Sequence, residues 1–311
     1  MISIVIPNFN GAELLKKNLP KVKEVLIDDK NLKVDIIIVD DGSTDNSLEI
    51  IENQRYEKPG LEITVLKNEK NMGFSSAVNR GVKRARGEIV ILLNTDAYPE
   101  KNFLKYLLPH FKNEKTFAVG CMDKSIEDGK TVLRGRGLGE WKRGFLMHRR
   151  GEIDKTNTLW VSGGSGAFSK SIWEKLGGFN EAYNPFYWED IDLSYRAKKA
   201  GYKVLFEPKS IVIHEHAEGA VREHYSMSEI KRISYRNQFV FVWINITDLG
   251  LQISHLVWLP YHFLKALIRW DIPFFLGFFN ALILLPIIIK SSFKYQKLFV
   301  KKDQEILSSY K

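Results

Sequence analysis

The sequence has a single cysteine, Cys121, among its 311 residues. One cysteine excludes an intramolecular disulfide framework and any zinc site built from a cysteine cluster, and it is typical of a reducing compartment. We expect Cys121 to pack in the core. The chain also starts without the basic and long apolar segments of a signal peptide, because the apolar run from Ile2 stops at Pro7. We therefore expect a cytoplasmic N-terminus.

Long uninterrupted apolar runs are also missing. The longest, residues 272–289, is broken by Pro273, Asn280 and Pro286. At ~1.5 Å per residue, a helix of that length falls just short of the ~30 Å hydrocarbon core of a bilayer. From Ala220 onward the chain carries twelve Lys and Arg against six Asp and Glu, within a total net charge of +9. A basic region of this kind suits nucleic acid or an anionic membrane surface.

Aromatic residues decide between these two partners. Trp258, Tyr261 and Trp270 lie just before the longest apolar run, and such residues gather at membrane interfaces. We expect residues 221–311 to form an apolar helical appendage on an anionic membrane surface, peripheral on the inner face of the cell membrane. A helical packing or dimerisation region and a membrane hairpin are the alternatives, and an oligomer stays open. Nucleic-acid binding is disfavoured, because apolar helices with aromatic belts fit lipid better than phosphate.

Residues 1–220 show a different pattern and are expected to form one domain. Short β-branched apolar runs alternate with amphipathic segments, which predicts an α/β fold with a Rossmann-like, mostly parallel sheet flanked by helices. The strands are predicted at 2–6, 34–40, 62–68 and 88–94, and the helices at 12–26, 46–54 and 75–86. Ligands bind such sheets at the carboxyl ends of the strands. That rule selects the loops PNFNG, DDGSTD, NMGF and NTDA.

The periodicity is weaker in the middle of the chain. Residues 117–160 are rich in Gly and Arg, and we interpret them as irregular loops, either a lid or plain surface. Residues 160–181 predict a strand, a turn, a second strand and a short helix. After a helix from Glu189 that ends at Gly201, strands are predicted at 203–207 and 210–214.

Acidic and amide side chains follow two of the predicted strands. Asp40 and Asp41 end one strand, where a carboxylate can accept from a base imide or a ribose hydroxyl, and the helix start after Gly42 suits phosphate. Asn94 and Asp96 follow another strand and can share a divalent ion with a diphosphate. The plainer interpretation is that both loops only turn the chain and cap helices.

Three further acids lie in the aromatic segment FYWEDIDLSYR. On a helix, Asp190 falls beside the apolar stripe and Glu189 lies at its boundary. Asp192 points away and is expected to form a weak surface pair with Arg196. The helix dipole favours the ionised form of Asp190 while aromatic burial raises its pKa, and the sequence does not decide which effect is larger.

Five segments in this order and spacing resemble the family 2 inverting glycosyltransferases with the GT-A fold. They are SIVIPNFNG, VDDGSTDNS, NMGFSSAVNRGVKRARGEIVILLNTDA, GGSGAFSKSIWEKLGGFNE and WEDIDLSYRAKKAGY. The similarity covers about residues 1–220, and the branch it looks like includes rhamnosyltransferases of cell-surface polysaccharide assembly. The resemblance implies transfer of a sugar from dTDP-rhamnose or a UDP-sugar to a saccharide or lipid-linked acceptor.

The resemblance also implies a donor and metal site. The donor-binding residues would be Pro7, Asn8, Asp40, Asp41, Asn71, Gly73, Asn79 and Asn94. Asp96 and His214 would hold a divalent metal, Mg or Mn, with His216 as a competitor of His214. Here the sequence departs from the family, because Asn94 replaces the first acid of its D-x-D motif and only Asp96 brings charge to the metal.

Asp190 matches the catalytic position of the family. Inversion requires one base for the acceptor hydroxyl, and Glu189 would orient the acceptor or the base. Trp188, Tyr187 and Gly164 would lie on the acceptor side, the aromatic pair by stacking on a sugar. The alternative is that both acids are helix caps and both aromatic residues are core.

Two other functions stay open. An inactive, membrane-associated scaffold with the same fold is compatible with the substitution at Asn94. A sugar nucleotidyltransferase would need a Gly-rich loop with a basic residue after the first strand, which PNFNGAEL does not provide.

Overall fold

The computed structural model describes residues 1–27, 33–55, 62–127, 130–214 and 224–310. Its strands are β1 (Ile2–Asn8), β2 (Val34–Asp40), β3 (Glu62–Lys67), β4 (Ile89–Leu93), β5 (Ala97–Pro99), β6 (Thr116–Glu127), β7 (Lys130–Arg134), β8 (Gly137–Lys142), β9 (Phe145–Arg150), β10 (Ser165–Ser169) and β11 (Lys203–His214). Its α-helices are α1 (Ala12–Ile27), α2 (Ser47–Arg55), α3 (Phe74–Arg84), α4 (Phe103–Leu107), α5 (Lys170–Leu176), α6 (Glu189–Lys199), α8 (Met227–Asn245), α9 (Leu249–Ile268), α10 (Ile272–Ile283), α11 (Leu285–Gln296) and α12 (Asp303–Ser308).

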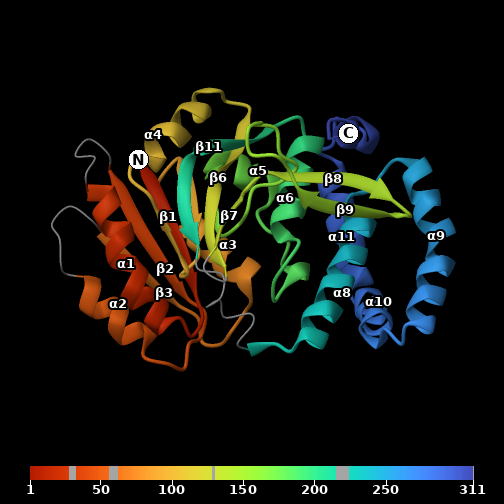
Figure 1. Ribbon diagram of the computed structural model, residues 1–311, viewed down its shortest axis with the longest axis horizontal. Helices are drawn as coiled ribbons and strands as arrows, with labels where there is room; N and C mark the ends of the chain where they lie inside the picture. The colour runs from red at the N-terminus through yellow and green to blue at the C-terminus, as the bar shows by residue number, and fades with distance from the viewer. Residues whose placement is uncertain (28–32, 56–61, 128–129, 215–223, 311) are drawn as a thin grey trace.

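Within the described residues, nine strands form one sheet, and the C-terminal helices α8–α11 lie to the right of it in Figure 1. Its order is β3-β2-β1-β4-β10-β6-β11-β5, and β7 pairs with β6. The strands β3, β2, β1 and β4 are parallel neighbours, while β10 runs antiparallel between β4 and β6. The predicted α/β fold with a mostly parallel sheet is therefore confirmed.

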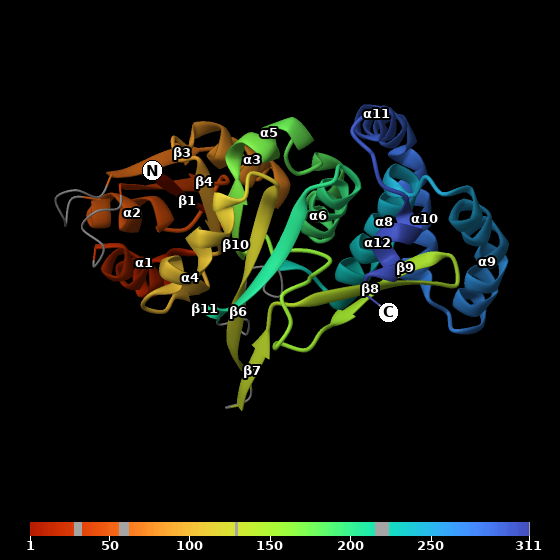
Figure 2. The same ribbon diagram turned by 90° about the horizontal axis from the view of Figure 1, so that it is seen from above.

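Alternation along the strands produces the two helical layers. Ile4 and Ile6 of β1 pack in the cluster that contains α1, α2 and α4, whereas Val5 packs in the cluster that contains α3, α5 and α6. Successive side chains of a strand point to opposite faces of the sheet. A strand buried on both sides therefore needs the continuous apolar run that the sequence shows. Figure 2 shows the helices on the two sides of the sheet.

The prediction of irregular loops at 117–160 is wrong. This segment contains the long strand β6, the strand β7 and the hairpin β8–β9, whose two strands pair antiparallel. The glycines that suggested loops have a packing role, because Gly137 lies against the ring of Trp160 and Gly139 against Leu159. A side chain at either glycine would occupy the space of these neighbours.

Two other predicted details also differ from the structure. The residues before Ser165 do not form a separate strand, so β10 is the only strand in the described part of 160–181. The two strands predicted at 203–214 are one strand, β11, with an irregularity between Glu207 and Ile211. Cys121 is buried in the sheet core, as expected.

The C-terminal helices share a core with the hairpin β8–β9. Phe145 of the hairpin packs against Phe239 of α8, with ring centroids 5.1 Å apart. The predicted boundary at 220/221 falls outside the described residues. Among the described helices, none alone has the length and hydropathy to cross a bilayer, but α10 and α11 pass that test together across a 65° bend.

Helix α6 is joined to these helices by a buried ion pair that was expected at the surface. Asp192 Oδ2 accepts from Arg196 Nε at 2.8 Å, and both side chains are almost completely buried. Asp192 Oδ1 accepts from the hydroxyl of Tyr183 and from the amide of Asn245 on α8. The side of α6 that carries Asp192 was expected to face solvent. In the folded chain it is buried, because α8 and α11 cover it.

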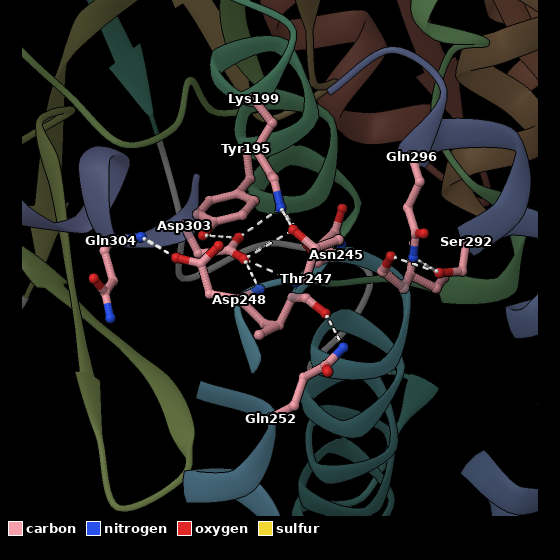
Figure 3. Close-up of polar contacts among 12 residues, drawn as sticks. Tyr195, Lys199, Asn245, Thr247, Asp248, Gln252, Ser292, Gln296, Asp303 and Gln304 are labelled. Atoms are coloured by element: carbon pink, nitrogen blue, oxygen red, sulfur yellow. Dashed lines mark hydrogen bonds and ion pairs between the residues drawn. The ribbon is translucent and has the colours of Figure 1, made fainter. Parts of the chain in front are cut away.

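A second buried ion pair joins α6 to the end of the chain (Figure 3). Lys199 Nζ donates to Asp303 Oδ1 at 2.8 Å, to the carbonyl of Asn245 and to the hydroxyl of Thr247. Asp303 also accepts from the hydroxyl of Tyr195 and from two backbone amides in the α8–α9 loop. Because both charged groups are surrounded by partners, the pair fixes α12 and this loop against α6.

The Asp303→Asn variant tests this pair. The substitution leaves Lys199 buried with too little negative charge, so we expect the free energy of unfolding to fall by about 3–5 kcal/mol. Glu305→Gln is the matched control, because it removes the exposed Lys301–Glu305 pair from the same helix and is expected to cost less than about 0.5 kcal/mol. Urea denaturation measures both. If both variants lowered the free energy of unfolding equally, the buried pair would contribute no more to stability than the exposed one.

Candidate active site

A cleft of about 590 Å³ opens at the carboxyl ends of β1, β2 and β4. Most of the residues predicted for the site line it, although they come from distant parts of the chain. These residues are Pro7, Asn8, Asp41, Asn71, Gly73, Asn94, Asp96, Gly164, Tyr187, Glu189, Asp190 and His214. Asp40, Asn79 and Trp188 are not among the lining residues. The cleft lies where the strand-end rule placed it.

The three remaining residues lie behind the cleft wall. Asp40 is fully buried and accepts from Asn8 Nδ2 at 2.9 Å, so it orients a residue that does line the cleft. Asn79 bonds the backbone of Phe179 in both directions. Trp188 is buried and packs 5.3 Å from the ring of Phe241 on α8. The structure therefore gives Trp188 the core position of the plainer interpretation.

Asp41 holds the loop between β3 and α3. Its Oδ1 accepts from Asn68 Nδ2, and its two oxygens accept from the backbone amides of Met72 and Gly73. These bonds fix Gly73, whose φ of 90° is unfavourable for other residues. Asp41 thus shapes the wall of the cleft by holding Asn71 and Gly73 in place.

Gly164 allows Asn94 to lie against the backbone. A side chain at residue 164 would come within 2.6 Å of Asn94 Nδ2. The backbone amide of Asn94 also donates to the carbonyl of Gly164 at 3.0 Å. The two residues, seventy positions apart, therefore form one piece of the cleft wall, and Gly164 acts there through Asn94.

Asp96 and His214 form a pair in the cleft. His214 Nε2 lies 3.0 Å from Asp96 Oδ1, and His214 Nδ1 lies 3.2 Å from Asp123 Oδ2. Burial of His214 opposes its protonation, but the two carboxylates outweigh burial and raise the pKa of His214 to about 9. His216, the other candidate, lies outside the described residues.

The donor set of this pair fits a hard divalent ion. The described residues contain no converging group of three or more His, Cys, Asp or Glu side chains. However, magnesium sites use one or two protein ligands together with substrate phosphates and water. Asp123 orients the far nitrogen of His214, as carboxylates usually do for metal-bound histidines. A histidine binds a metal only through a deprotonated nitrogen, so an ion here would replace the proton between His214 Nε2 and Asp96. On that condition Asp96 and His214 are the residues able to hold a metal.

A strained backbone turn aims the acids of α6 into the cleft. Tyr187 and Trp188 both have positive φ, 71° and 76°, a region that bulky residues rarely adopt. The side chain of Asn237 on α8 donates to the carbonyls of Phe186 and Tyr187 at 2.9 and 2.8 Å. Tertiary contacts from α8 therefore maintain the strain.

The two acids of this turn ionise differently. Burial raises the pKa of Asp190 to about 6, against the backbone hydrogen bond from Ile191 at 2.7 Å. Burial raises the pKa of Glu189 well above its ordinary value, and the charge of Asp190 raises it further. Among the described residues, Glu189 Oε2 is buried without a hydrogen-bond partner. Asp190 accepts a backbone hydrogen bond that favours its charged form and Glu189 Oε2 does not, so Asp190 is the acid that loses its proton more readily.

Sequence reasoning missed several lining residues. Phe9, Arg134, Arg150, His224 and Tyr225 also face the cleft. Phe9 lies in the loop PNFNG, which the strand-end rule selected, so the sequence could have predicted it. The two arginines lie on β7 and β9, which the sequence did not reveal as strands. They bring positive charge to a cleft that otherwise holds four carboxyl groups.

Comparisons with known proteins agree with this geometry. The family model described as "Glycosyl transferase family 2" matches residues 3–177. The chain is 28% identical over 213 residues to the "Probable glycosyltransferase YdaM" of Bacillus subtilis, covering 68% of this chain and 49% of that protein. It is 24% identical over 215 residues to the poly-beta-1,6-N-acetyl-D-glucosamine synthase of Staphylococcus aureus, covering 67% and 48%. The chain thus spans about half the length of these curated relatives.

Solved structures share the fold. S. aureus TarS 1-349 in complex with UDP-GlcNAc has a TM-score of 0.61 and 16% identity, covering 99% of this chain and 91% of that one. GalNAc-T7 with UDP, GalNAc and Mn2+ has a TM-score of 0.66 and 19% identity, covering 80% and 48%. These neighbours hold a nucleotide or nucleotide sugar, and the second also holds Mn2+.

The Asp190→Asn variant tests the electrostatics of the turn. With a raised pKa, folded Asp190 keeps a proton that the unfolded chain releases between about pH 4 and pH 6. Its contribution to stability is complete below the unfolded pKa and is lost as the pH rises through that window. The variant removes the buried charge, so we expect its free energy of unfolding to exceed that of the wild type by on the order of 1–2 kcal/mol at about pH 8.

Urea denaturation at two pH values checks this expectation. At about pH 4, where Asp190 is protonated, the variant and the wild type are expected to have similar stability. Glu140→Gln, which removes an exposed acid of β8, is the control and should have no effect at either pH. A variant less stable than the wild type at high pH would show that the helix dipole outweighs burial.

Proposed function

Because this chain belongs to glycosyl transferase family 2, we propose that it transfers a sugar from a nucleoside-diphosphate donor to an acceptor hydroxyl with inversion. The observation that carries the proposal is the pair of acids at the start of α6, which face the same cleft as Asp96, His214 and two arginines. Of the two, Asp190 accepts a backbone hydrogen bond that favours its ionised form, whereas Glu189 Oε2 has no hydrogen-bond partner among the described residues. This arrangement is suited to a direct displacement with a single base.

In this mechanism Asp190 accepts the proton of the acceptor hydroxyl. The acceptor oxygen forms a bond to the anomeric carbon while the bond from that carbon to the diphosphate oxygen breaks. A base is most effective when its pKa lies near the working pH, and burial moves Asp190 in that direction. Burial raises the pKa of Glu189, and in its protonated form Glu189 can donate a hydrogen bond to the acceptor or to Asp190. No covalent intermediate is needed.

The leaving diphosphate requires positive charge. Arg134 and Arg150 line the cleft and can bind phosphate oxygens with their guanidinium groups. We propose Asp96 and His214 as the residues that hold a divalent metal, Mg or Mn. Such an ion, when bound, neutralises charge that develops on the diphosphate. Because Asn94 is neutral, Asp96 supplies the negative charge for a metal at the end of β4.

The donor and acceptor are proposed from the sequence resemblance and the shape of the cleft. We propose dTDP-rhamnose or a UDP-sugar as donor, with the base near Pro7, Asn8 and Phe9. Tyr187 is 43% exposed at the cleft and offers a stacking surface for a saccharide or lipid-linked acceptor. These substrates suit the assembly of a cell-surface polysaccharide. Screening nucleotide sugars by thermal shift would identify the donor.

The Asp190→Asn variant also tests the base. We expect kcat to fall by about 10²- to 10⁴-fold because the variant cannot accept the proton. Donor affinity, measured by calorimetry, should stay within twofold, since the diphosphate groups bind elsewhere in the cleft. In the wild type, kcat/KM should rise with pH through about 6, as Asp190 ionises.

Glu189→Gln is the matched comparison for this variant. Glutamine imitates a protonated carboxyl group, so we expect a smaller loss of kcat and an unchanged pH midpoint. If Asp190→Asn retains turnover, Asp190 is not the base. If the wild type binds donors but transfers no sugar to any acceptor, the inactive scaffold becomes the better interpretation.

A chelator tests the metal. We expect transfer to stop when divalent ions are removed and to recover with Mn or Mg. Asp123→Asn loosens the orientation of His214, so the metal concentration needed for half of the maximal activity should rise by roughly 10- to 100-fold. Glu140→Gln serves again as the control. Activity that is equal with and without chelator would exclude this role of Asp96 and His214.

A further inference from the structure

Helix α9 turns its most apolar side away from the molecule. Five aliphatic residues at helical spacing are each more than half exposed, namely Leu249, Ile253, Leu256, Leu264 and Leu267. A surface helix of a soluble protein usually buries such a stripe and exposes its polar side. A large exposed apolar patch of this kind marks an interaction surface.

The opposite side of α9 is firmly occupied. His255 is buried, and its Nδ1 lies 2.7 Å from the carbonyl of Gly144 at the tip of the hairpin β8–β9. Its Nε2 accepts from the indole of Trp243 at 3.1 Å. Ala266 is also buried. Because these contacts fix the rotation of the helix, the stripe cannot turn inward.

Helix α10, the neighbour of α9, also exposes an apolar side. Its outward residues Ile272, Leu276, Phe279 and Ile283 are 45–76% exposed. Its inner side packs on α8, where Gly277 lies against the backbone of Arg232. Figures 1 and 2 both place α9 and α10 at the end of the molecule opposite to α1 and α2. These four residues and the five of α9 form what we term the outer apolar face.

A row of aromatic and basic residues borders this face. Trp258, Tyr261 and Lys265 follow one another along α9 at spacings of three and four residues, beside the stripe. Arg143 from the hairpin tip donates to the hydroxyl of Tyr261 at 2.8 Å and lies 5.7 Å from the ring of Trp258. A helix that lies in a bilayer surface places apolar side chains deepest, aromatic side chains at the headgroups and basic side chains toward the water.

The charged groups of this region are few and have a positive excess. Between Leu249 and Ile283 they are Lys265, Arg269 and one acid, Asp271, which accepts from the hydroxyl of Tyr235 at 2.7 Å. Arg143 at the hairpin tip adds a further positive charge. Lys265 and Arg269 are exposed. An anionic surface complements this charge. A second copy of the chain does not, because a symmetric contact would bring the same positive groups together.

We propose that the outer apolar face docks on an anionic lipid bilayer, with α9 and α10 lying in the plane of the interface. The row of Trp258, Tyr261 and Lys265 lies at the level of the headgroups. Each of the two helices has one side on the protein and the other free, as this orientation requires. Docking of this kind is independent of the transfer chemistry in the cleft.

Sedimentation of the full chain with lipid vesicles tests the proposal. We expect binding to vesicles of phosphatidylcholine mixed with phosphatidylglycerol, with weaker binding to phosphatidylcholine alone and weaker binding at high salt. The double variant Leu256→Glu/Leu264→Glu should lower the partition coefficient by roughly tenfold or more. The charge-matched control is Lys105→Gln/Tyr106→Glu, which changes two exposed residues of α4 at the far end, lowers the net charge by the same two units and should bind nearly as the wild type.

Two further measurements sharpen the result. Lys265→Gln/Arg269→Gln should reduce the preference for phosphatidylglycerol while leaving the folded state intact by circular dichroism. Light scattering of the lipid-free chain shows whether the face is covered by a second copy. A dimer that the Leu256→Glu/Leu264→Glu variant dissociates, together with no vesicle binding, would overturn the proposal. Equal binding to vesicles with and without phosphatidylglycerol would overturn the proposal that the bilayer is anionic. Transfer to a soluble acceptor reports on the cleft separately.

Discussion

The structure depends on how helix α6 is held. Two buried ion pairs, Asp192–Arg196 and Lys199–Asp303, join it to α8, α11, α12 and the α8–α9 loop. A buried charge without its partner is very costly, so the Lys199–Asp303 pair ties the position of α6 to that of α12. The Asp192–Arg196 pair lies within α6 and contacts α8 through the hydrogen bond from Asn245 to Asp192. Asp190 begins the same helix. The C-terminal region is therefore part of the framework that aims the acid into the cleft.

This framework supports an unfavourable local structure. Two bulky residues with positive φ precede α6, and two acids lie close together where burial raises the pKa of both. Neither feature stabilises the fold. They persist because Asn237, the ion pairs and the apolar core around α8 over-determine the turn. Burial of the acid lowers the stability of the fold, and the same burial raises the pKa of Asp190 toward neutrality.

The predicted sheet was close to the observed one where strands are consecutive and buried on both sides. The runs that became β1, β2 and β4 are mostly apolar, and the residues that follow or end them belong to the cleft. The hairpin β8–β9 was missed because its glycines serve packing against Trp160 and Leu159, which no local pattern reveals. Because β9 was not predicted, Arg150 was not recognised as a charged residue of the cleft.

By itself, the sequence determined the α/β order, the loops at the strand ends and the candidate acid Asp190. Periodicity and turn chemistry are local properties, so a stretch of ten residues contains them. Only the tertiary structure decided that Asp192 is buried, that Trp188 is core, that Asp40 stands behind the cleft and that α9 exposes its apolar side. Burial, pKa and outward orientation depend on what covers a residue, and the covering groups lie far away in the chain.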